Sequence, residues 1–367
     1  MNQARSDVVG SLLRVEGLAA ARQRHAAGEL PHAGFKAVED AAVDRCLRLQ
    51  EGCGLDVVTD GEQRRLSFQS QLVEAVDGFG TWDLDAFLWG EWRSAEVGDR
   101  SVARPELAVR ERLARKRFLS AEEFTYLRGR TDRVPKVTLP SPSLFANFWD
   151  PRHPPDAYRT LDDFLADVTR ILAEEVDELA RLGATYLQLD APHYTMLLDP
   201  SYRQFYESRG VPADDWLAFG LELDNAVMTR HPQVTFGFHL CRGNQASRWL
   251  VAGGYDRLAQ GVFDAVTASR LLLEYDDERS GGFEPLAAVP EDKHVVLGLV
   301  TTKTGRLEDR DAVVARLREA AAYLPLERLS VSTQCGFGTS VVGNALSFDE
   351  QEAKLRLVSD VARTVWG

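Results

Sequence analysis

Residues 236–244 read F-G-F-H-L-C-R-G-N, and this stretch decides how the rest of the chain is interpreted. It begins as an apolar run typical of a strand, and its last three residues form a turn signal. His239 and Cys241 stand two positions apart, so in an extended chain their side chains project from the same face. Imidazole and thiolate are both zinc ligands. The pair alone does not establish a metal site, because most such pairs are structural.

Strand-like runs recur along the chain, and each is followed by a loop and a helical pattern. The expected strands are residues 7–10, 55–59, 136–139, 185–189, 234–239, 271–273, 295–300 and 329–332. The buried runs are almost continuously apolar, as parallel strands covered on both faces are. Eight β-then-α units predict an α/β fold, a (β/α)8 TIM barrel. A doubly wound sheet is the alternative, but G-S-L-L at residues 10–13 is not the glycine-rich phosphate loop that it needs.

Three helices illustrate the alternation. Residues 160–181 form the clearest one, because Thr160 is a suitable N-cap, Asp163 lies in the first turn, and apolar residues follow at helical spacing. Residues 255–268 are expected to form a helix between the fifth and sixth strands. The last helix opens with S-F-D-E at residues 347–350, which is a capping box.

Residues 78–134 interrupt the alternation after the second strand. They contain Trp82, Trp89 and Trp92 and many charged residues. This segment is too rich in apolar residues to be disordered, so we interpret it as a folded insertion that covers the barrel mouth. No linker divides the chain, and residues 1–367 are predicted to form a single catalytic domain.

Composition limits the classes of partner. The formal net charge of -13 over 367 residues argues against a nucleic-acid backbone as partner. No apolar run approaches the roughly 20 residues that span a bilayer, and the first ten residues lack a signal-peptide pattern. The expected location is the cytoplasm, where four cysteines are better interpreted as thiols or ligands than as disulfides. The sequence permits a homo-oligomer.

Polar residues follow the expected strands, at positions that share the C-terminal rim of a barrel. These residues are Ser11, Asp60, Glu62, Asp190, His239, Cys241, Glu274, Lys303 and Cys335. Each taken singly is better explained as a loop residue or a helix cap. A histidine, two cysteines and a glutamate in this set can nevertheless converge on one tetrahedral metal, and their ligand types suit zinc. Cys46 and Cys53 precede the second strand and receive no role.

The ligand types also indicate the chemistry of such a zinc ion. Two thiolates and a carboxylate reduce its Lewis acidity, which disfavours the activation of water. They suit a zinc that binds a substrate thiol, lowers its pKa and leaves the thiolate nucleophilic. The expected reaction is alkyl transfer to sulfur, with Glu274 as the ligand that yields when the substrate sulfur arrives.

Several motifs carry a family resemblance that runs from V-V-G-S at Val8 to the last helix. They are D-G-E-Q-R-R from Asp60, L-Q-L-D-A-P from Leu187, F-H-L-C-R-G-N from Phe238, L-E-Y-D-D-E-R-S-G-G-F-E-P from Leu273, L-G-L-V-T-T-K from Leu297 and S-T-Q-C-G-F-G-T from Ser332. The chain resembles the catalytic domain of cobalamin-independent methionine synthase. It is most similar to the single-barrel branch, which includes epoxyalkane:coenzyme M transferase. The resemblance implies a barrel of the uroporphyrinogen decarboxylase/methionine synthase-like type.

The resemblance also implies roles for individual residues. Zinc would be held by His239, Cys241, Glu274 and Cys335. The carboxylate and amine of the thiol amino acid would be contacted by Ser11, the Gly10 backbone, Glu62 and Asp190. Lys303 stands where the synthases carry a histidine proposed as a proton donor, so Lys303 and Asp190 are the expected catalytic residues. A lysine can protonate a leaving nitrogen only if desolvation lowers its pKa.

The predicted function is a zinc-dependent methyltransferase that activates homocysteine as a zinc thiolate and forms methionine. The predicted donor is of the 5-methyltetrahydrofolate type. As a single barrel, the chain is expected to lack the second, N-terminal barrel with which full-length synthases help to bind the folate tail. The alternative is a specialised zinc-dependent alkyltransferase with another thiol or electrophile, similar to the epoxide:coenzyme M enzymes or serving secondary metabolism. A third hypothesis is a zinc-stabilised binding or regulatory barrel, which the clustered carboxylates and Lys303 disfavour.

Overall fold

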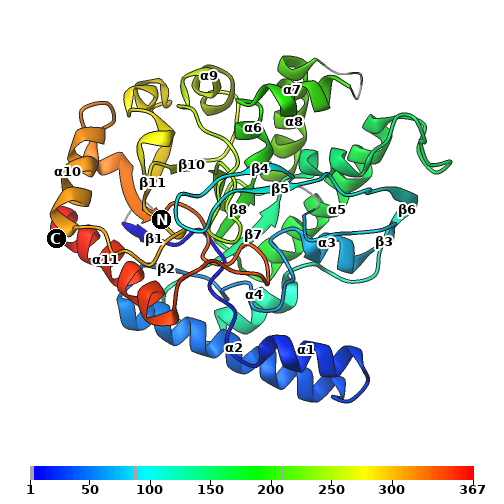
Figure 1. Cartoon of the computed structure of the whole chain (residues 1–367), viewed down its shortest axis with the longest axis horizontal. Helices are drawn as coiled ribbons and strands as arrows, with labels where there is room; N and C mark the ends of the chain where they lie inside the picture. The colour runs from blue at the N-terminus through cyan, green and yellow to red at the C-terminus, as the bar shows by residue number, and fades with distance from the viewer. Residues whose placement is uncertain (1–3, 86–88, 209, 211) are drawn as a thin grey trace.

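A parallel sheet of eight strands forms the centre of the computed structural model, which describes residues 4–85, 89–208, 210 and 212–367 (Figure 1). In sheet order the strands are β1 (Ser6–Asp7), β12 (Leu329–Thr333), β11 (His294–Val300), β10 (Arg270–Glu274), β9 (Thr235–Leu240), β8 (Tyr186–Asp190), β7 (Val134–Pro140) and β2 (Val57–Val58). The two end strands meet through Asp56, whose carboxylate accepts the N–H groups of Arg5 at 2.8 Å and Ser6 at 2.9 Å. The sheet is therefore a nearly closed barrel, and the predicted TIM-type fold is confirmed.

Each expected strand overlaps one strand of the barrel, but the first and second are shorter than expected. β1 and β2 contain two residues each, whereas residues 7–10 and 55–59 were expected. Where β1 and β2 approach each other, side chains take the place of the hydrogen bonds between neighbouring strands. The N–H of Val8 donates to Asp7 Oδ1 at 2.8 Å, and the N–H of Thr59 donates to Gln50 Oε1 at 3.0 Å. Backbone groups satisfied in this way do not need a neighbouring strand.

Helices cover the outside of the barrel. They are α1 (Leu18–Ala26), α2 (His32–Cys53), α3 (Ser70–Ala75), α4 (Ala121–Arg128), α5 (Leu161–Arg181), α6 (Pro192–Met196), α7 (Pro200–Glu207), α8 (Ala213–Met228), α9 (Asp256–Leu258), α10 (Arg310–Ala320) and α11 (Phe348–Trp366). The Thr160 hydroxyl accepts the N–H of Asp163 at 3.1 Å, and Ser347 and Glu350 form a capping box, so both predicted caps are confirmed. Within the described residues no helix is long and apolar enough to cross a membrane.

The helix expected at residues 255–268 is much shorter in the structure. α9 ends at Leu258, and a π-helical turn follows at Ala259–Phe263. Gly261 lies inside this segment and weakens α-helix formation. The wider turn buries the side chains of Val262 and Phe263 completely.

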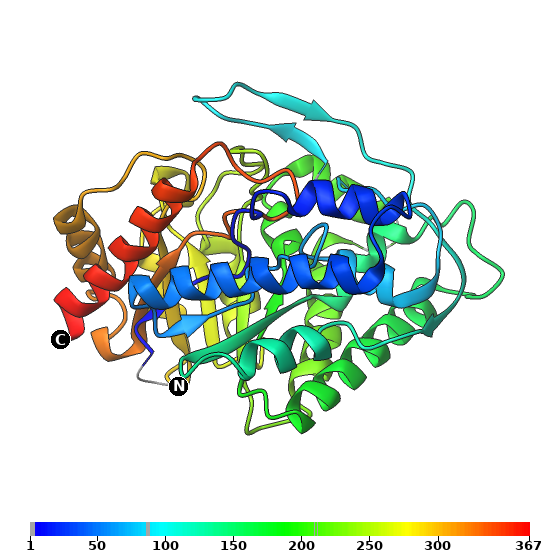
Figure 2. The ribbon, with the colours of Figure 1, turned by 90° about the horizontal axis from the view of Figure 1, so that it is seen from below.

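The expected insertion at residues 78–134 takes part in two small antiparallel sheets, of which only β4–β5 is a hairpin, and it also contains one helix of the barrel. β3 (Val76–Phe79) pairs with β6 (Val109–Arg115), and β4 (Gly90–Trp92) pairs with β5 (Arg100–Val102), both antiparallel. Residues 86–88 of the insertion lie outside the described residues. α4 packs against β7 and so belongs to the outer layer of the barrel. Figure 2 shows the β4–β5 hairpin along one edge of the molecule.

A buried polar cluster occupies the N-terminal half of the barrel interior. We call Asp7, Lys136, Tyr186, Arg270 and Ser330 the basal cluster. Lys136 Nζ lies 2.8 Å from Asp7 Oδ1, and both side chains are completely buried. The Tyr186 hydroxyl donates to Asp7 Oδ2 at 2.9 Å, and Arg270 Nη2 donates to Ser330 Oγ at 3.2 Å. Lys136 and Asp7 thus neutralise each other at the base of the barrel, while the Arg270 guanidinium is hydrogen-bonded to a neutral hydroxyl.

Candidate metal centre and substrate cavity

Three predicted ligands converge at the C-terminal end of the barrel. His239 lies near the end of β9, Cys241 directly follows that strand, and Cys335 lies two positions after β12. Their ligand atoms all lie within 4.8 Å of one another, and all three residues are buried. In the part of the chain that the structure describes, no other group of His, Cys, Asp or Glu side chains meets this criterion. Strand ends far apart in the sequence therefore bring a metal-type ligand set together.

The His239 ring is oriented as a metal ligand would be. Its Nδ1 lies 2.9 Å from Asp190 Oδ1, which also accepts Gln188 Nε2 at 2.7 Å. Its Nε2 is buried and has no hydrogen-bond partner. Burial by itself lowers the pKa of His239, but the charges of Cys241 and Asp190 raise it overall. A carboxylate that orients histidine through one nitrogen, leaving the other for a metal, is a common arrangement in metal sites.

The cysteines divide into two kinds. A hydrogen bond from Cys335 lowers the pKa of the Cys241 thiol and raises the pKa of Cys335 itself, so this buried pair favours one thiolate, on Cys241. Burial instead raises the pKa of Cys46 to about 12 and that of Cys53 to about 11. Because the thiolate is the metal ligand, only the first pair contains a cysteine with the required charge. The residues present therefore fit zinc with two sulfur ligands and one nitrogen ligand.

Glu274, the fourth predicted ligand, is engaged elsewhere. Its Oε1 pairs with Arg279 Nη2 and lies 3.4 Å from Lys303 Nζ. Its Oε2 accepts the backbone N–H of Arg242 at 2.7 Å. Lys303 Nζ also lies 2.8 Å from Asp276 Oδ2, so the predicted proton donor is part of the same ion cluster. The structure brings Glu274 and Lys303 together but does not add either to the three-ligand group.

A cavity opens beside the three ligands. Its wall is formed by Val9, Ser11, Glu62, Phe68, Asp190, Pro192, His239, Cys241, Gly243, Asn244, Cys335, Gly336 and Thr339. Ser11, Glu62 and Asp190 were predicted as substrate contacts, and all three are on the wall. Gly10 lies behind it, where a Cβ atom would stand 2.7 Å from Glu62 Oε1. The glycine thus allows the glutamate to occupy its position.

Glu62 is held in an unusual conformation with one free oxygen. Its φ of 54° is in the left-handed region, and its N–H donates to Asp60 Oδ1 at 2.8 Å. Oε1 accepts the Thr138 hydroxyl at 2.8 Å, whereas Oε2 is buried without a partner. Burial raises the pKa of Glu62 to about 7, although Arg65 opposes the shift. Strain and an unsatisfied buried oxygen together are typical of a ligand-binding position.

Sequence reasoning missed the contacts that join the two cysteine-bearing loops. Asn244 follows Cys241, and its Nδ2 donates to the carbonyl of Gly336 at 2.8 Å, next to Cys335. Asn344 Nδ2 donates to Asn244 Oδ1 at 3.1 Å. In the sequence Asn244 indicates only a turn, because Gly336 and Asn344 are separated from it by 92 and 100 positions. The hydrogen bond between Asn244 and Gly336 joins the loop that carries Cys241 to the loop that carries Cys335.

Comparison with known proteins identifies the family. Residues 6–364 match the family described as the cobalamin-independent synthase, catalytic domain. The chain belongs to this family. The uncharacterized protein YxjG of Bacillus subtilis (strain 168) is 35% identical over 366 residues, which is 99% of this chain and 94% of that protein. The methionine synthase of Pyrococcus abyssi is 26% identical over 333 residues, which is 90% of this chain and 85% of the relative.

A solved structure agrees with this membership of the cobalamin-independent synthase family. The putative vitamin-B12 independent methionine synthase from Listeria monocytogenes superposes with a TM-score of 0.74 at 25% identity. The match covers 99% of this chain and 98% of that one. The resemblance inferred from the motifs is confirmed. Family membership supports a methyltransferase of the methionine synthase-like type.

Proposed function

We infer that this protein transfers a methyl group to the sulfur of homocysteine, from a donor of the 5-methyltetrahydrofolate type. The grouping of His239, Cys241 and Cys335 carries this inference, because their ligand atoms lie within 4.8 Å of one another and His239 Nε2 has no hydrogen-bond partner. These three residues would hold zinc. When bound, zinc supplies the Lewis acidity that lowers the pKa of a substrate thiol.

The cavity wall suits the amino-acid part of homocysteine. Glu62 and Asp190 present carboxylates to an ammonium group, and the free Oε2 of Glu62 is an acceptor without a donor. Ser11 and the adjacent Gly10 backbone are the proposed contacts of the substrate carboxylate. Asp190 has a second task, because it also holds the His239 ring in place.

The charge of the wall helps to choose between thiols. Among the described residues that line the cavity, two are carboxylates and none is lysine or arginine. A thiol that carries an amine is favoured there over a thiol that carries only an anionic group, such as coenzyme M. The name of the Pyrococcus abyssi relative, methionine synthase, agrees with homocysteine as the acceptor. The proton-donor role of Lys303 remains a proposal, because its ammonium is paired with Asp276.

The test is methionine formation by the zinc-loaded protein with homocysteine and mono- or polyglutamylated methyltetrahydrofolate. The comparison thiol is 4-mercaptobutyrate, which matches homocysteine but lacks the amine. Homocysteine should bind at least about tenfold more tightly, since the buried carboxylates lose their partner with the analogue. Glu62→Gln should reduce this discrimination. Equal binding of both thiols to the wild-type protein would refute the amine contacts, and absence of methionine with every donor would refute the proposed reaction.

A further inference from the structure

We propose that Arg65 is a positioning residue for the amine subsite of the cavity. Acting through the Thr138 hydroxyl, it engages Oε1 of Glu62 and leaves Oε2 for the ammonium group of the substrate. This inference rests on the proposed function for the identity of that ammonium group. We call Arg65, Thr138 and Glu123 the Arg65 network. None of these three described residues is on the cavity wall.

The hydrogen bonds from Arg65 to Glu62 run in one direction. Arg65 Nη1 donates to the Thr138 hydroxyl oxygen at 2.8 Å, and that hydroxyl lies 2.8 Å from Oε1 of Glu62. A guanidinium has donors only, so the hydroxyl accepts from Arg65 and its own hydrogen is left for Glu62. Oε1 is therefore an acceptor whether or not the carboxyl group is ionised. A protonated Glu62 carries its hydrogen on Oε2, the oxygen that a substrate ammonium would contact.

Gly10 makes room for the contact between the carboxylate and the hydroxyl. A Cβ atom at this position would stand 2.7 Å from Oε1 of Glu62 and 2.9 Å from Cγ2 of Thr138, closer than a real Cβ atom packs. A side chain on residue 10 would therefore push the two groups apart. Arg65 Nη1 itself lies 3.6 Å from Oε1, so the charge of the guanidinium acts on the same oxygen.

The guanidinium of Arg65 is held on its other side by α4. Its Nε lies 3.2 Å from both carboxylate oxygens of Glu123, and its Nη2 lies 2.7 Å from Oε2 of that residue. Nη2 also donates to the Thr138 carbonyl at 3.1 Å, so the guanidinium bridges α4 and β7. Several hydrogen bonds to one planar group fix its orientation. The helix within residues 78–134 thus supports the cavity wall without being part of it.

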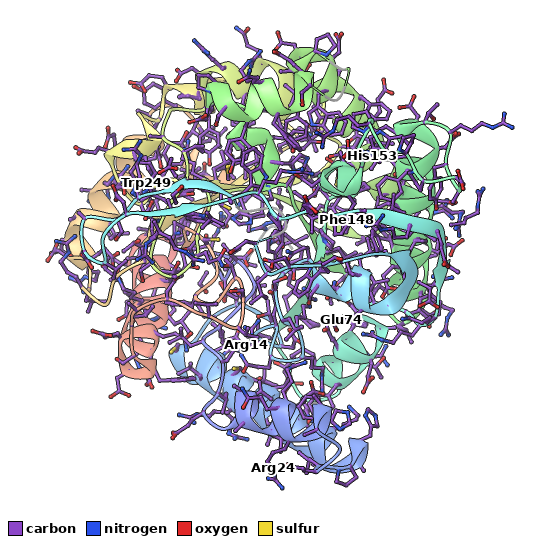
Figure 3. All side chains as sticks on the ribbon, turned by 45° about the vertical axis from the view of Figure 1, so that its right-hand side comes forward. Arg14, Arg24, Glu74, Phe148, His153 and Trp249 are labelled. Carbon is purple, nitrogen blue, oxygen red and sulfur yellow. The ribbon has the colours of Figure 1, made fainter. Side chains whose placement is uncertain are left out.

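Other charged groups also act on Glu62. Asp60 Oδ1 accepts its N–H at 2.8 Å, and Asp190 faces it from β8. Arg14 lies where the loops that follow β1, β2 and β12 meet, and it donates to backbone carbonyl groups of all three (Figure 3). Burial raises the pKa of Glu62 to about 7, and the nearby charge of Arg65 is the largest opposing influence. Arg65 therefore affects both the orientation of the carboxylate and its ionisation.

The experiment compares the binding of homocysteine and 4-mercaptobutyrate to the zinc-loaded protein between about pH 5.5 and 8. Both thiols meet the same metal, so the ratio of their Kd values reports the amine contacts alone. In wild type the preference for homocysteine should rise with pH through about 7, because only an ionised Glu62 accepts the ammonium on Oε2. Thr138→Val should reduce the preference at pH 8 by about fivefold, since Oε1 loses its donor and the carboxylate can turn. Thr138→Ser, which keeps the hydroxyl, should restore it.

A second variant tests the charge of Arg65. Arg65→Met combined with Glu123→Gln removes the cation without leaving a buried carboxylate unpaired. The pH at which the preference for homocysteine appears should move up by about one unit, because the cation that lowers the pKa of Glu62 is gone. A general loss of packing would weaken the binding of both thiols and leave this pH unchanged. Ser120→Ala is the matched control, because it removes only the 3.4 Å hydrogen bond to the same guanidinium.

Infrared spectroscopy gives a readout that needs no substrate. The carbonyl stretch of protonated Glu62, assigned as the band that Glu62→Gln lacks, should move to higher frequency in Thr138→Val because its hydrogen bond is lost. An unchanged band and an unchanged thiol preference in Thr138→Val would overturn the role of the Arg65 network, as would a double variant that titrates like wild type. If the band shifts as expected while wild type binds both thiols equally, the Arg65 network stands and the proposed amine contact fails.

Discussion

Two polar groups are buried inside the same barrel, and they differ in how completely they are paired. In the basal cluster, Lys136 and Asp7 neutralise each other, and the Tyr186 hydroxyl takes the second Asp7 oxygen. At the rim, His239 Nε2 and Glu62 Oε2 are equally buried but have no partner in the protein. An unsatisfied buried polar atom costs about 1–3 kcal/mol. The base of the barrel thus serves stability, whereas the rim keeps unsatisfied groups ready for ligands.

The largest effect is expected for Cys335→Ser, which removes a ligand from the rim without touching the basal cluster. Activity should be abolished, and the metal Kd should rise by at least about a hundredfold, because a thiolate ligand is lost. Metal content after dialysis and a competition titration with a chelator would measure this. Cys53→Ser is the control, since that thiol lies outside the site. Full metal content in Cys335→Ser would contradict the three-ligand assignment.

The converse change is Lys136→Met in the basal cluster. It leaves the Asp7 carboxylate buried without its cation and should lower the free energy of unfolding by about 3–5 kcal/mol. Urea denaturation of the metal-free protein would measure the loss. The double variant with Asp7→Asn should recover part of it, because no unpaired charge remains. A change in metal affinity with no change in stability would mean that the two polar groups do not divide their roles in this way.

Glu62→Gln should raise the free energy of unfolding of the protein and weaken its binding of the substrate amine. The pKa of Glu62 is raised to about 7 in the folded protein, above the usual glutamate value of about 4.3. The folded state therefore holds the proton more tightly, and wild-type stability falls as pH rises from about 4.3 to 7 and is level above that range. The variant should exceed wild type by roughly 1–3 kcal/mol at pH 8 and by little at pH 4. Unfolding curves at both pH values would test this, and equal differences at the two would contradict it.

A smaller effect is expected for Asp190→Asn. The amide cannot match the carboxylate as an acceptor for His239 Nδ1, so the metal Kd should rise by about 10- to 100-fold in the absence of substrate. Gln188→Ala provides a comparison, because Gln188 donates to the same Asp190 oxygen and makes no hydrogen bond to the histidine. It should weaken metal binding less. Identical losses in both variants would indicate that Asp190 acts through packing and not through the imidazole.

The architecture followed from local patterns. Almost continuous apolar runs indicate buried parallel strands, and the caps at Thr160 and Ser347 depend on neighbours within three residues. Their physical causes are contained in a few consecutive side chains, so a sequence reveals them. The same reasoning was wrong for residues 255–268, where tertiary packing of Val262 and Phe263 selects a π turn over a regular helix.

The candidate site was predictable as a set of residue types and strand ends. Parallel strands of a barrel direct their C-terminal ends to one rim, so His239, Cys241 and Cys335 were expected together, and their convergence follows from that topology. Glu62 and Asp190 were placed there by the same rule and do lie on the cavity wall. The motif that contains Glu274 also contains Arg279. The spacing of these residues does not reveal that their side chains form an ion pair.

The sequence by itself determined the barrel and the ligands available at its rim, because periodicity and strand order are local properties of the chain. Tertiary structure alone decided which polar groups are paired. Glu274 meets Lys303 across 29 positions, and Asn244 meets Asn344 across 100. His239 keeps one nitrogen for Asp190 and one without a partner. The energy of a buried charge depends on its nearest neighbours in space, and those neighbours exist only once the barrel has closed.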